Sequence, residues 1–293
     1  MKWLELPEIP MQSIEVDSGH KIDVLRLDKT DDYISGNKWF KLKYNLIEAS
    51  NLGYSQLLTF GGAYSNHIHS TAAACKSFGL QGIAIVRGEE HLPLNPTLQF
   101  AKDCGMKVHY INRSQYRDKY NPALIKKFEQ LFGKFYLVPE GGTNELAVKG
   151  ASEIPDLFQK QYDVIALASG TGGTTAGITI NNICKHSKIL SFPVLKGGGF
   201  LQKDIEDLLG YVPSNLELVT DYHFGGYAKT TTELLEFIVD VNDEFNIPLE
   251  PIYTGKAFYG LLDYLKTKGI DEETSVLYLH TGGLQGNNEV ILS

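Results

Sequence analysis

Lys38 is the residue whose surroundings best fit nucleophilic chemistry. It follows the turn residue Gly36, is flanked by Trp39 and Phe40, and precedes apolar residues at helical spacing. The sequence therefore predicts that Lys38 lies in the first turn of a helix. The positive end of the helix dipole and the apolar neighbours both disfavour an ammonium ion there, so we expect a neutral, nucleophilic amine. A lysine considered alone is far more often a solvated surface residue, so other residues must support this interpretation.

Three glycine-rich turns, at 61–67, 169–174 and 281–286, each follow a predicted strand. Strands alternate with helices along much of the chain, and this order predicts parallel sheets with helices on their faces. In open parallel sheets, ligands bind beyond the carboxyl ends of the strands. We therefore expect these turns to bind ligands.

The turn at 169–174 carries the strongest signal for phosphate. Its glycines let backbone N–H groups point into one concavity at the start of a helix, and Ser169, Thr171 and Thr174 can add hydroxyl donors. The turn is neither a Walker A loop nor a GxGxxG motif. A small phosphate-bearing cofactor fits it best, and a tight turn without a ligand is the alternative.

The turn at 61–67 also opens a predicted helix. Its free N–H groups and the Ser65 hydroxyl could hold a carboxylate, and the Asn66 amide could bond a phenolic oxygen. Helix capping alone would explain both residues equally well. His67 and His69 are two residues apart and do not share a helix face, and no cluster has the spacing of metal ligands. The sequence predicts no metal site.

The expected elements alternate in type along the chain. Strands are expected at 22–27, 56–60, 82–86, 107–111, 135–138, 163–168, 189–194 and 275–280. Helices are expected from the region of Lys38 to about Gly53, from the second glycine-rich turn to Ile183, and at 67–78, 93–104, 121–132, 147–161, 202–209 and 230–246. Because the pattern restarts after residue 142, we predict a small α/β domain at 45–142 and a large cofactor-binding domain made of 1–44 and 143–293.

Composition excludes several classes of partner. The 293 residues are 43% hydrophobic, and 27 basic against 35 acidic residues give a net charge of −8. Since no basic run stands out, nucleic acid and anionic membranes are poor partners. Cys75, Cys104 and Cys184 are widely spaced, which is typical of reduced cysteines. No signal-like segment or membrane-length apolar run is present, so we expect a cytoplasmic protein.

A tuned lysine, a phosphate turn and a carboxylate turn are the parts required for pyridoxal phosphate chemistry on an amino acid. Five motifs agree with this reading: Ser35-Gly36-Asn37-Lys38 with Lys41-Leu42, Gly61-Gly62-Ala63-Tyr64-Ser65-Asn66-His67, Ser169-Gly170-Thr171-Gly172-Gly173-Thr174, Pro251-Ile252-Tyr253-Thr254-Gly255-Lys256, and His280-Thr281-Gly282-Gly283. Because these motifs occur in this order between about residues 20 and 290, the chain resembles the 1-aminocyclopropane-1-carboxylate deaminase/D-cysteine desulfhydrase family. The resemblance implies an α/β protein of two domains with three-layer, open twisted sheets, known as fold type II of pyridoxal phosphate enzymes.

The resemblance also implies roles for residues around the substrate. Lys38 would hold the cofactor as a Schiff base and act as the catalytic base. Asn66 would bond the phenolic oxygen of the cofactor. Ser65, with Asn66 and His67 beside it, would bind the substrate, and Tyr253 matches the catalytic tyrosine of the family.

The remaining implied roles concern the two ends of the cofactor. Thr281 lies where a group faces the pyridine nitrogen. Lys41 and the second glycine-rich turn would bind the phosphate, which assigns cofactor contacts to Ser169, Gly170, Thr171, Gly172, Gly173 and Thr174.

The family divides between two reactions, opening of the cyclopropane ring to 2-oxobutanoate and ammonia, and elimination of sulfide from D-cysteine. Ring-opening members typically have Glu after the catalytic tyrosine and Leu before the last Gly-Gly, where this chain has Thr254 and Thr281. His67 also resembles the desulfhydrase branch, and Phe224 stands where a second tyrosine tends to occur in ring-opening members. We expect D-cysteine desulfhydrase-like elimination, with the deaminase as the alternative.

Two other functions stay open from the residues alone. A non-catalytic relative that binds a phosphorylated metabolite would keep the glycines without needing Lys38. A different enzyme of the same fold, such as a threonine dehydratase or cysteine synthase, would carry other sequence around the lysine. Whichever holds, the expected partner is a small amino acid, and the resemblance implies a homodimer.

Some conspicuous residues are expected to have no role in the reaction. Trp39, Phe40 and Tyr278 are expected to pack in the core, and Lys43 and Lys256 to be exposed to solvent.

Overall fold

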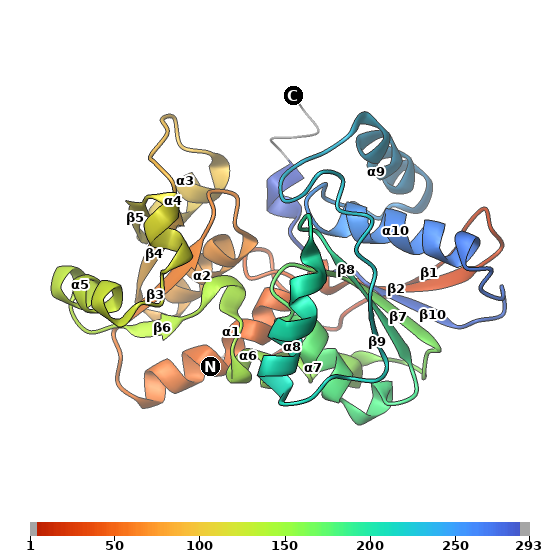
Figure 1. The fold of residues 1–293 in the computed structure, drawn as a ribbon, viewed down its shortest axis with the longest axis horizontal. Coiled ribbons are helices and arrows are strands. Elements are labelled where there is room, and N and C mark those ends of the chain that lie inside the picture. Colours follow the sequence, from red (N-terminus) through yellow and green to blue (C-terminus); the bar gives the residue numbers. More distant parts are fainter. Residues whose placement is uncertain (1–4, 288–293) are drawn as a thin grey trace.

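The computed structural model describes residues 5–287, so the first four and last six positions of the predicted large domain lie outside the described residues. Two β-sheets, each with helices around it, form the molecule (Figure 1). The larger sheet has the strand order β1 (Met11–Glu15), β2 (Lys21–Leu25), β10 (Val276–Leu279), β7 (Val164–Ser169), β8 (Lys188–Pro193) and β9 (Leu216–Leu218). Its β1–β2 pair is antiparallel, and its other neighbouring strands are parallel.

The smaller sheet is wholly parallel. Its strand order is β5 (Lys107–Ile111), β4 (Gln81–Arg87), β3 (Gln56–Gly61) and β6 (Tyr136–Val138). Parallel strands require crossovers, and the helices supply them. They are α1 (Asn37–Asn51), α2 (Asn66–Phe78), α3 (Pro96–Asp103), α4 (Arg113–Arg117), α5 (Pro122–Phe132), α6 (Glu145–Ala151), α7 (Gly173–Ile180), α8 (Leu201–Leu209), α9 (Thr232–Phe245) and α10 (Thr254–Thr267).

Both sheets are buried on both faces. Along β7, Val164 and Ala166 join a core with α9 and α10, whereas Ile165 and Leu167 join a core with α1. Figure 1 shows α9 and α10 together on one side of the larger sheet. The smaller sheet packs against α4 and α5 on one face and against α2 and α3 on the other. Apolar residues on both faces are typical of parallel strands, and the predicted three-layer α/β class is confirmed.

Helix α1 connects the two sheets. Its Leu42 and Leu46 are fully buried in a core that also contains residues of the larger sheet and Leu57 of the smaller one. Trp39 and Phe40 join the same core, which confirms the prediction that they pack in the interior. The helix therefore has a fixed orientation relative to both sheets.

Most of the predicted elements are present, with two kinds of error. The C-cap predicted at Gly79 is confirmed by its φ of 68°. The helix predicted at 147–161 is wrong beyond Ala151, where α6 ends and a short 3₁₀ turn, Ile154–Leu157, follows. Pro155 lacks the N–H that a continued helix would require.

Helix α10 is absent from the prediction, although Phe258, Leu261 and Leu265 recur along it at helical spacing. Gly255 and Gly260 lower the local helix propensity and obscure this signal. The short elements β1, β9 and α4 are also absent from the prediction. Tyr278 of β10 is buried in the core, as predicted.

Each of the two sheets takes its strands from one of the two predicted domains. All four strands of the smaller sheet fall between residues 45 and 142, and all strands of the larger sheet fall outside that range. The domain boundaries themselves stay a prediction.

Two further observations concern the cysteine thiols and the search for a membrane-spanning helix. Cys75 and Cys184 are buried, Cys104 is half-buried, and all three are free thiols. No helix within residues 5–287 has both the length and the apolar character needed to cross a bilayer.

A tight crossing of α6 over α1 can be tested at Gly150. A Cβ at this position would lie 1.9 Å from the carbonyl oxygen of Phe40 in α1. We expect Gly150→Ala to lower the free energy of unfolding by roughly 1–3 kcal/mol, because overpacking outweighs the gain of about 1 kcal/mol in helix propensity. Gly199→Ala is the control, since no atom lies within 4 Å of its added Cβ. Urea unfolding would measure both variants, and equal stability of Gly150→Ala and the parent would contradict the crossing.

Candidate active site

A cavity of about 420 Å³ opens at the carboxyl ends of strands from both sheets. Every residue that the sequence predicted for the site lines it: Lys38, Lys41, Ser65, Asn66, His67, Ser169, Gly170, Thr171, Gly172, Gly173, Thr174, Tyr253 and Thr281. The cavity thus lies beyond the strand ends, where ligands were expected to bind. The individual roles of these residues stay predictions.

The first turn of α1 is fixed by a close contact with the end of β10. Gly36 has a φ of 70°, and a Cβ there would lie 2.0 Å from the carbonyl oxygen of Thr281. The N–H of Asn37 donates to that oxygen at 3.2 Å. The Asn37 side chain then accepts from Nζ of Lys38 at 2.8 Å and donates to Oγ1 of Thr174 at 2.8 Å. Asn37, whose role the sequence did not reveal, thereby joins Lys38 to the phosphate turn.

The pKa of the Lys38 amine is shifted in the direction that the sequence predicted. Burial lowers its pKa to about 8, and the nearby Glu250 carboxylate acts in the opposite direction with a smaller effect. A substantial fraction of the amine is therefore neutral near pH 8, in the nucleophilic form.

Lys41 lies in a cradle suited to an anion. Its buried amine donates to Oγ1 of Thr143 at 2.9 Å and to Oγ1 of Thr171 at 3.4 Å. A Cβ on Gly173, the first residue of α7, would lie 3.2 Å from this amine, so only glycine leaves the space open. Burial and the charge of Lys38 hold the pKa of Lys41 well below its usual range. An amine, hydroxyls and a helix N-terminus are a donor set that fits a phosphate dianion.

The carboxylate turn begins α2. Ser65 is the N-cap, and its Oγ accepts from the N–H of Ile68 at 3.3 Å. Asn66 accepts a hydrogen bond from the side-chain amide of Gln285, and its own amide nitrogen lies over Gly283. Residues of the first and third glycine-rich turns are thus in contact.

His67 occupies a supporting position in the wall. Thr59 donates its hydroxyl proton to the carbonyl of Val138, so Nε2 of His67 donates to Thr59 at 2.8 Å. Nδ1 lies 3.5 Å from the Thr71 hydroxyl. Burial, followed by the charges of the two lysines, lowers the pKa of His67 well below its usual range, so the imidazole is neutral. Its substrate-binding role stays a prediction.

Two tyrosines face one another across the cavity. The Tyr253 ring lies over Gly170, and the Tyr227 ring is 6.1 Å away at an interplanar angle of 70°. Burial raises the pKa values of both tyrosines, so both phenols are neutral at physiological pH. The sequence analysis compared Phe224 with the second tyrosine of ring-opening members, and this correspondence stays a prediction. Phe224 packs on Tyr259, 5.1 Å between ring centroids, and Tyr227 three residues later reaches the cavity.

Glu250 is a buried carboxylate that sequence reasoning missed. Its oxygens accept the N–H groups of Ile252, Tyr253 and Thr254 at 2.8, 2.7 and 2.6 Å. These bonds satisfy the free donors at the start of α10 and fix the backbone of Tyr253. Burial raises the pKa of Glu250, and the backbone donors oppose that shift. A carboxylate shortly before a helix is the signal that could have revealed it.

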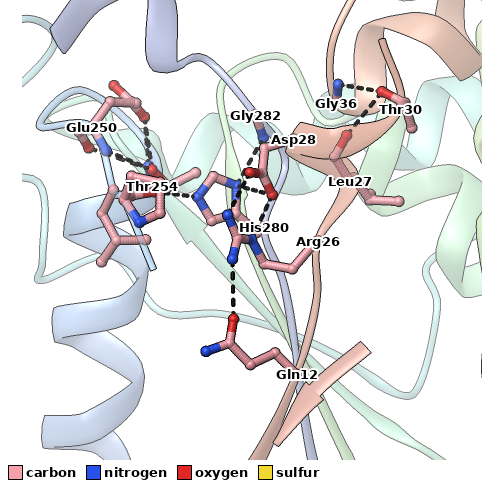
Figure 2. Close-up of polar contacts among 12 residues, drawn as sticks. Gln12, Arg26, Leu27, Asp28, Thr30, Gly36, Glu250, Thr254, His280 and Gly282 are labelled. Carbon is pink, nitrogen blue, oxygen red and sulfur yellow. Dashed lines mark hydrogen bonds and ion pairs between the residues drawn. The ribbon is translucent and has the colours of Figure 1, made fainter. Parts of the chain in front are cut away.

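A buried polar network surrounds His280, beside the turn that follows β10 (Figure 2). Arg26 donates to both oxygens of Asp28, at 2.8 and 2.7 Å, and Asp28 lies 3.4 Å from Nδ1 of His280. Nε2 of His280 donates to the carbonyl of Pro248 at 2.6 Å, and Nδ1 accepts from the N–H of Gly282 at 3.3 Å. Burial lowers the pKa of His280, which favours this neutral form. The network joins the end of β2 to the turn that contains Thr281.

Two lysines do not have the exposed positions predicted for them. Lys256 is fully buried, and its amine donates to backbone carbonyls. Lys43 is half-buried and forms a 2.6 Å ion pair with Glu153. The partners of both lysines are distant in sequence, at Glu153 and at the carbonyls of His223 and Gly226, so the spacing of apolar residues did not reveal them.

The wall contributed by the smaller sheet carries charges that the sequence analysis also missed. Arg87 lies at the end of β4, and Lys119 pairs with Glu140 at 3.0 Å. The Tyr116 hydroxyl donates to the same glutamate at 2.8 Å. Arg87, Lys119 and Glu140 come from three separate segments of the chain, so the linear sequence does not group them.

Known proteins resemble the chain over nearly its whole length. It is 32% identical over 295 residues to a Pyrococcus horikoshii protein whose name assigns it provisionally to the 1-aminocyclopropane-1-carboxylate deaminases, covering 95% of this chain and 90% of that protein. It is 30% identical over 311 residues to the bifunctional mitochondrial D-cysteine desulfhydrase/1-aminocyclopropane-1-carboxylate deaminase of Arabidopsis thaliana, covering 97% and 76%. No protein-family model matches the chain.

Solved structures also resemble the chain over nearly its whole length. The crystal structure of an ACC deaminase homologue has a TM-score of 0.83 at 30% identity, covering 96% of this chain and 91% of that one. A pyridoxal 5'-phosphate-dependent aspartate racemase has a TM-score of 0.70 at 13% identity, covering 99% and 94%, and shows the fold alone. The predicted fold type II is confirmed.

The lowered pKa of Lys38 predicts an unusual pH dependence of labelling. In the cofactor-free protein, acetylation of Lys38 should rise with pH through a midpoint near 8, because only the neutral amine reacts. Exposed lysines titrate near ~10.4 and are the internal control. Competitive labelling with peptide mass spectrometry would measure both, and a Lys38 midpoint equal to that of exposed lysines would contradict the assignment.

Proposed function

Because the chain belongs to the 1-aminocyclopropane-1-carboxylate deaminase/D-cysteine desulfhydrase family of pyridoxal phosphate-dependent enzymes, we propose that it degrades a small amino acid to a 2-oxo acid and ammonia. The first candidate reaction is β-elimination from D-cysteine, in which D-cysteine and water give pyruvate, ammonia and hydrogen sulfide. Support for an enzymatic role comes from the buried amine, the anion cradle and the carboxylate turn, which all line one cavity.

We assign the proposed cofactor contacts to the amines, hydroxyls and amides that line the cavity. Lys38 is the attachment residue, and Lys41, Thr171 and the N-terminus of α7 hold the phosphate. Asn66 is the proposed donor to the phenolic oxygen, held in place by Gln285. When bound, pyridoxal phosphate supplies the electron sink that makes the Cα–H bond of an amino acid acidic.

The proposed work of the chain itself is binding and proton transfer. Ser65 and the free N–H groups of α2 bind the substrate carboxylate, which suits a helix N-terminus. The neutral amine of Lys38 takes the Cα proton. Tyr253 and Tyr227, both neutral because burial raises their pKa values, offer a hydroxyl proton to the departing sulfur.

The observation that carries the choice of β-elimination is the hydroxyl of Thr281 in the cavity wall. A hydroxyl cannot hold a proton on a ring nitrogen as a carboxylate would, and the weaker electron sink suits departure of a β-substituent. The buried carboxylate of Glu250 is turned to the backbone of 252–254, and Glu250 is not among the residues that line the cavity. Thr254 lies beside it and bonds to its carboxylate.

One observation favours ring opening as a second candidate. The preference for the desulfhydrase reaction rested in part on the absence of a second tyrosine, but Tyr227 lies beside Tyr253 in the cavity. Two neutral phenols would serve a ring-opening reaction as well as an elimination. The homodimer and the cytoplasmic location implied by the family stay predictions.

Product analysis distinguishes the candidates. We expect the pyridoxal phosphate-loaded protein to convert D-cysteine to pyruvate and sulfide faster than it converts 1-aminocyclopropane-1-carboxylate to 2-oxobutanoate. L-cysteine is the stereochemical control. Faster formation of 2-oxobutanoate would select the second candidate. If neither substrate reacts, both reactions are wrong and a non-catalytic binder of a phosphorylated metabolite becomes the better explanation.

Lys38 provides the test of catalysis. Lys38→Ala should lower kcat by about 10²–10⁴-fold, the usual contribution of a positioned base. Lys43→Met is the matched control on the same helix, because Lys43 is not among the cavity residues and makes a partly exposed ion pair of small energetic value. Borohydride reduction and peptide mapping would identify the modified lysine, and labelling elsewhere would exclude Lys38 as the attachment residue.

A further inference from the structure

Lys256 is a fully buried cation whose hydrogen bonds join two distant segments. It is the third residue of α10, and 0% of its surface is exposed. Its Nζ donates to the carbonyl oxygen of His223 at 3.0 Å and to that of Gly226 at 2.8 Å. Both acceptors belong to one turn, about thirty residues earlier in the chain.

The position is electrostatically costly for a lysine. A positive charge in the first turn opposes the helix dipole, and burial disfavours the charged form. Burial lowers the pKa of Lys256 to about 8, while the Glu250 carboxylate favours the ammonium ion. The two carbonyl bonds and Glu250 offset this cost, so the amine is held by specific partners.

The turn that Lys256 holds has an unusual backbone. Phe224, Gly225, Gly226 and Ala228 all have positive φ values, 49°, 89°, 116° and 54°. The left-handed region is unfavourable for residues with a Cβ. Such a turn keeps one conformation only when its surroundings impose it, and the Lys256 amine binds it at two carbonyls.

Tyr227 lies within this turn, directly after the second carbonyl that Lys256 binds. Its ring meets that of Tyr253 in the cavity, and Tyr253 directly precedes α10. The first turn of α10 therefore controls both tyrosines, Tyr253 through the backbone bonds of Glu250 and Tyr227 through the amine of Lys256.

We propose that Lys256 is a positioning residue, whose two hydrogen bonds to the 223–226 turn hold Tyr227 against Tyr253 and so align the tyrosine pair toward the substrate side chain. The catalytic part of this inference rests on the proposed function. The structural part, that the amine holds the turn, does not.

Hydrogen exchange tests the structural part directly. In Lys256→Met, which keeps the side-chain length and removes the donors, amides of 223–229 should exchange roughly tenfold faster or more than in the parent protein. Lys266→Met is the matched control, an exposed lysine in the last turn of the same helix, and should leave these amides unchanged. If Lys256→Met does not fold, Lys256→Gln, which keeps a donor without the charge, carries the comparison. Unchanged exchange at 223–229 would overturn the proposal.

A double-mutant cycle tests the catalytic part in the holoenzyme. Lys256→Met should lower kcat by about 10–100-fold, the effect of a small misplacement, with KM and cofactor binding nearly unchanged. In a Tyr227→Phe background the same substitution should have little further effect, because Lys256 acts through the Tyr227 hydroxyl. Fully additive losses would overturn positioning through Tyr227. Absence of turnover in the parent protein would count against the proposed function alone, and exchange would still decide whether Lys256 holds the turn.

Discussion

The close approach of Gly36 to the carbonyl of Thr281 is the constraint on which the site depends. It starts α1 at the end of β10, so that Lys38 and Lys41 both face the cavity. Any side chain at position 36 would occupy the space of that carbonyl oxygen. The contact is rigid because the turn after β10 is held from behind by His280 and its buried partners (Figure 2).

This placement brings two buried amines close together beside helix N-termini. Burial favours the neutral form of both amines, and the charge of Lys38 adds to this effect at Lys41. A bound dianion would favour the charged form in the cradle around Lys41. The same surroundings suit the roles proposed for the two lysines, covalent chemistry for Lys38 and phosphate binding for Lys41. Glu250, buried near both α1 and α10, limits the shift at Lys38.

Helix α10 organises the opposite side of the cavity. Glu250, which precedes the helix, accepts the N–H groups at its start, and the buried amine of Lys256 lies in its first turn. Each of these two groups fixes a segment that bears a tyrosine. In the proposed function, the choice between elimination and ring opening would depend on groups held by α10 and on the hydroxyl of Thr281, whereas cofactor attachment would depend on α1. The two sides of the cavity have separate structural supports, so substrate preference can change without changing the attachment residue.

The sequence by itself determined the alternation of strands and helices, the glycine-rich turns at strand ends, and the candidate residues of those turns. These are local properties, set by hydrophobic periodicity and by the backbone freedom of glycine. The order of the motifs along the chain is likewise visible in the sequence itself. Only the tertiary structure decided which tyrosine joins Tyr253, that Lys256 is buried, and that Glu250 caps α10. Those facts depend on contacts between residues that are distant in sequence or hidden behind a turn, and spacing along the chain carries no information on which side chains such contacts bring together.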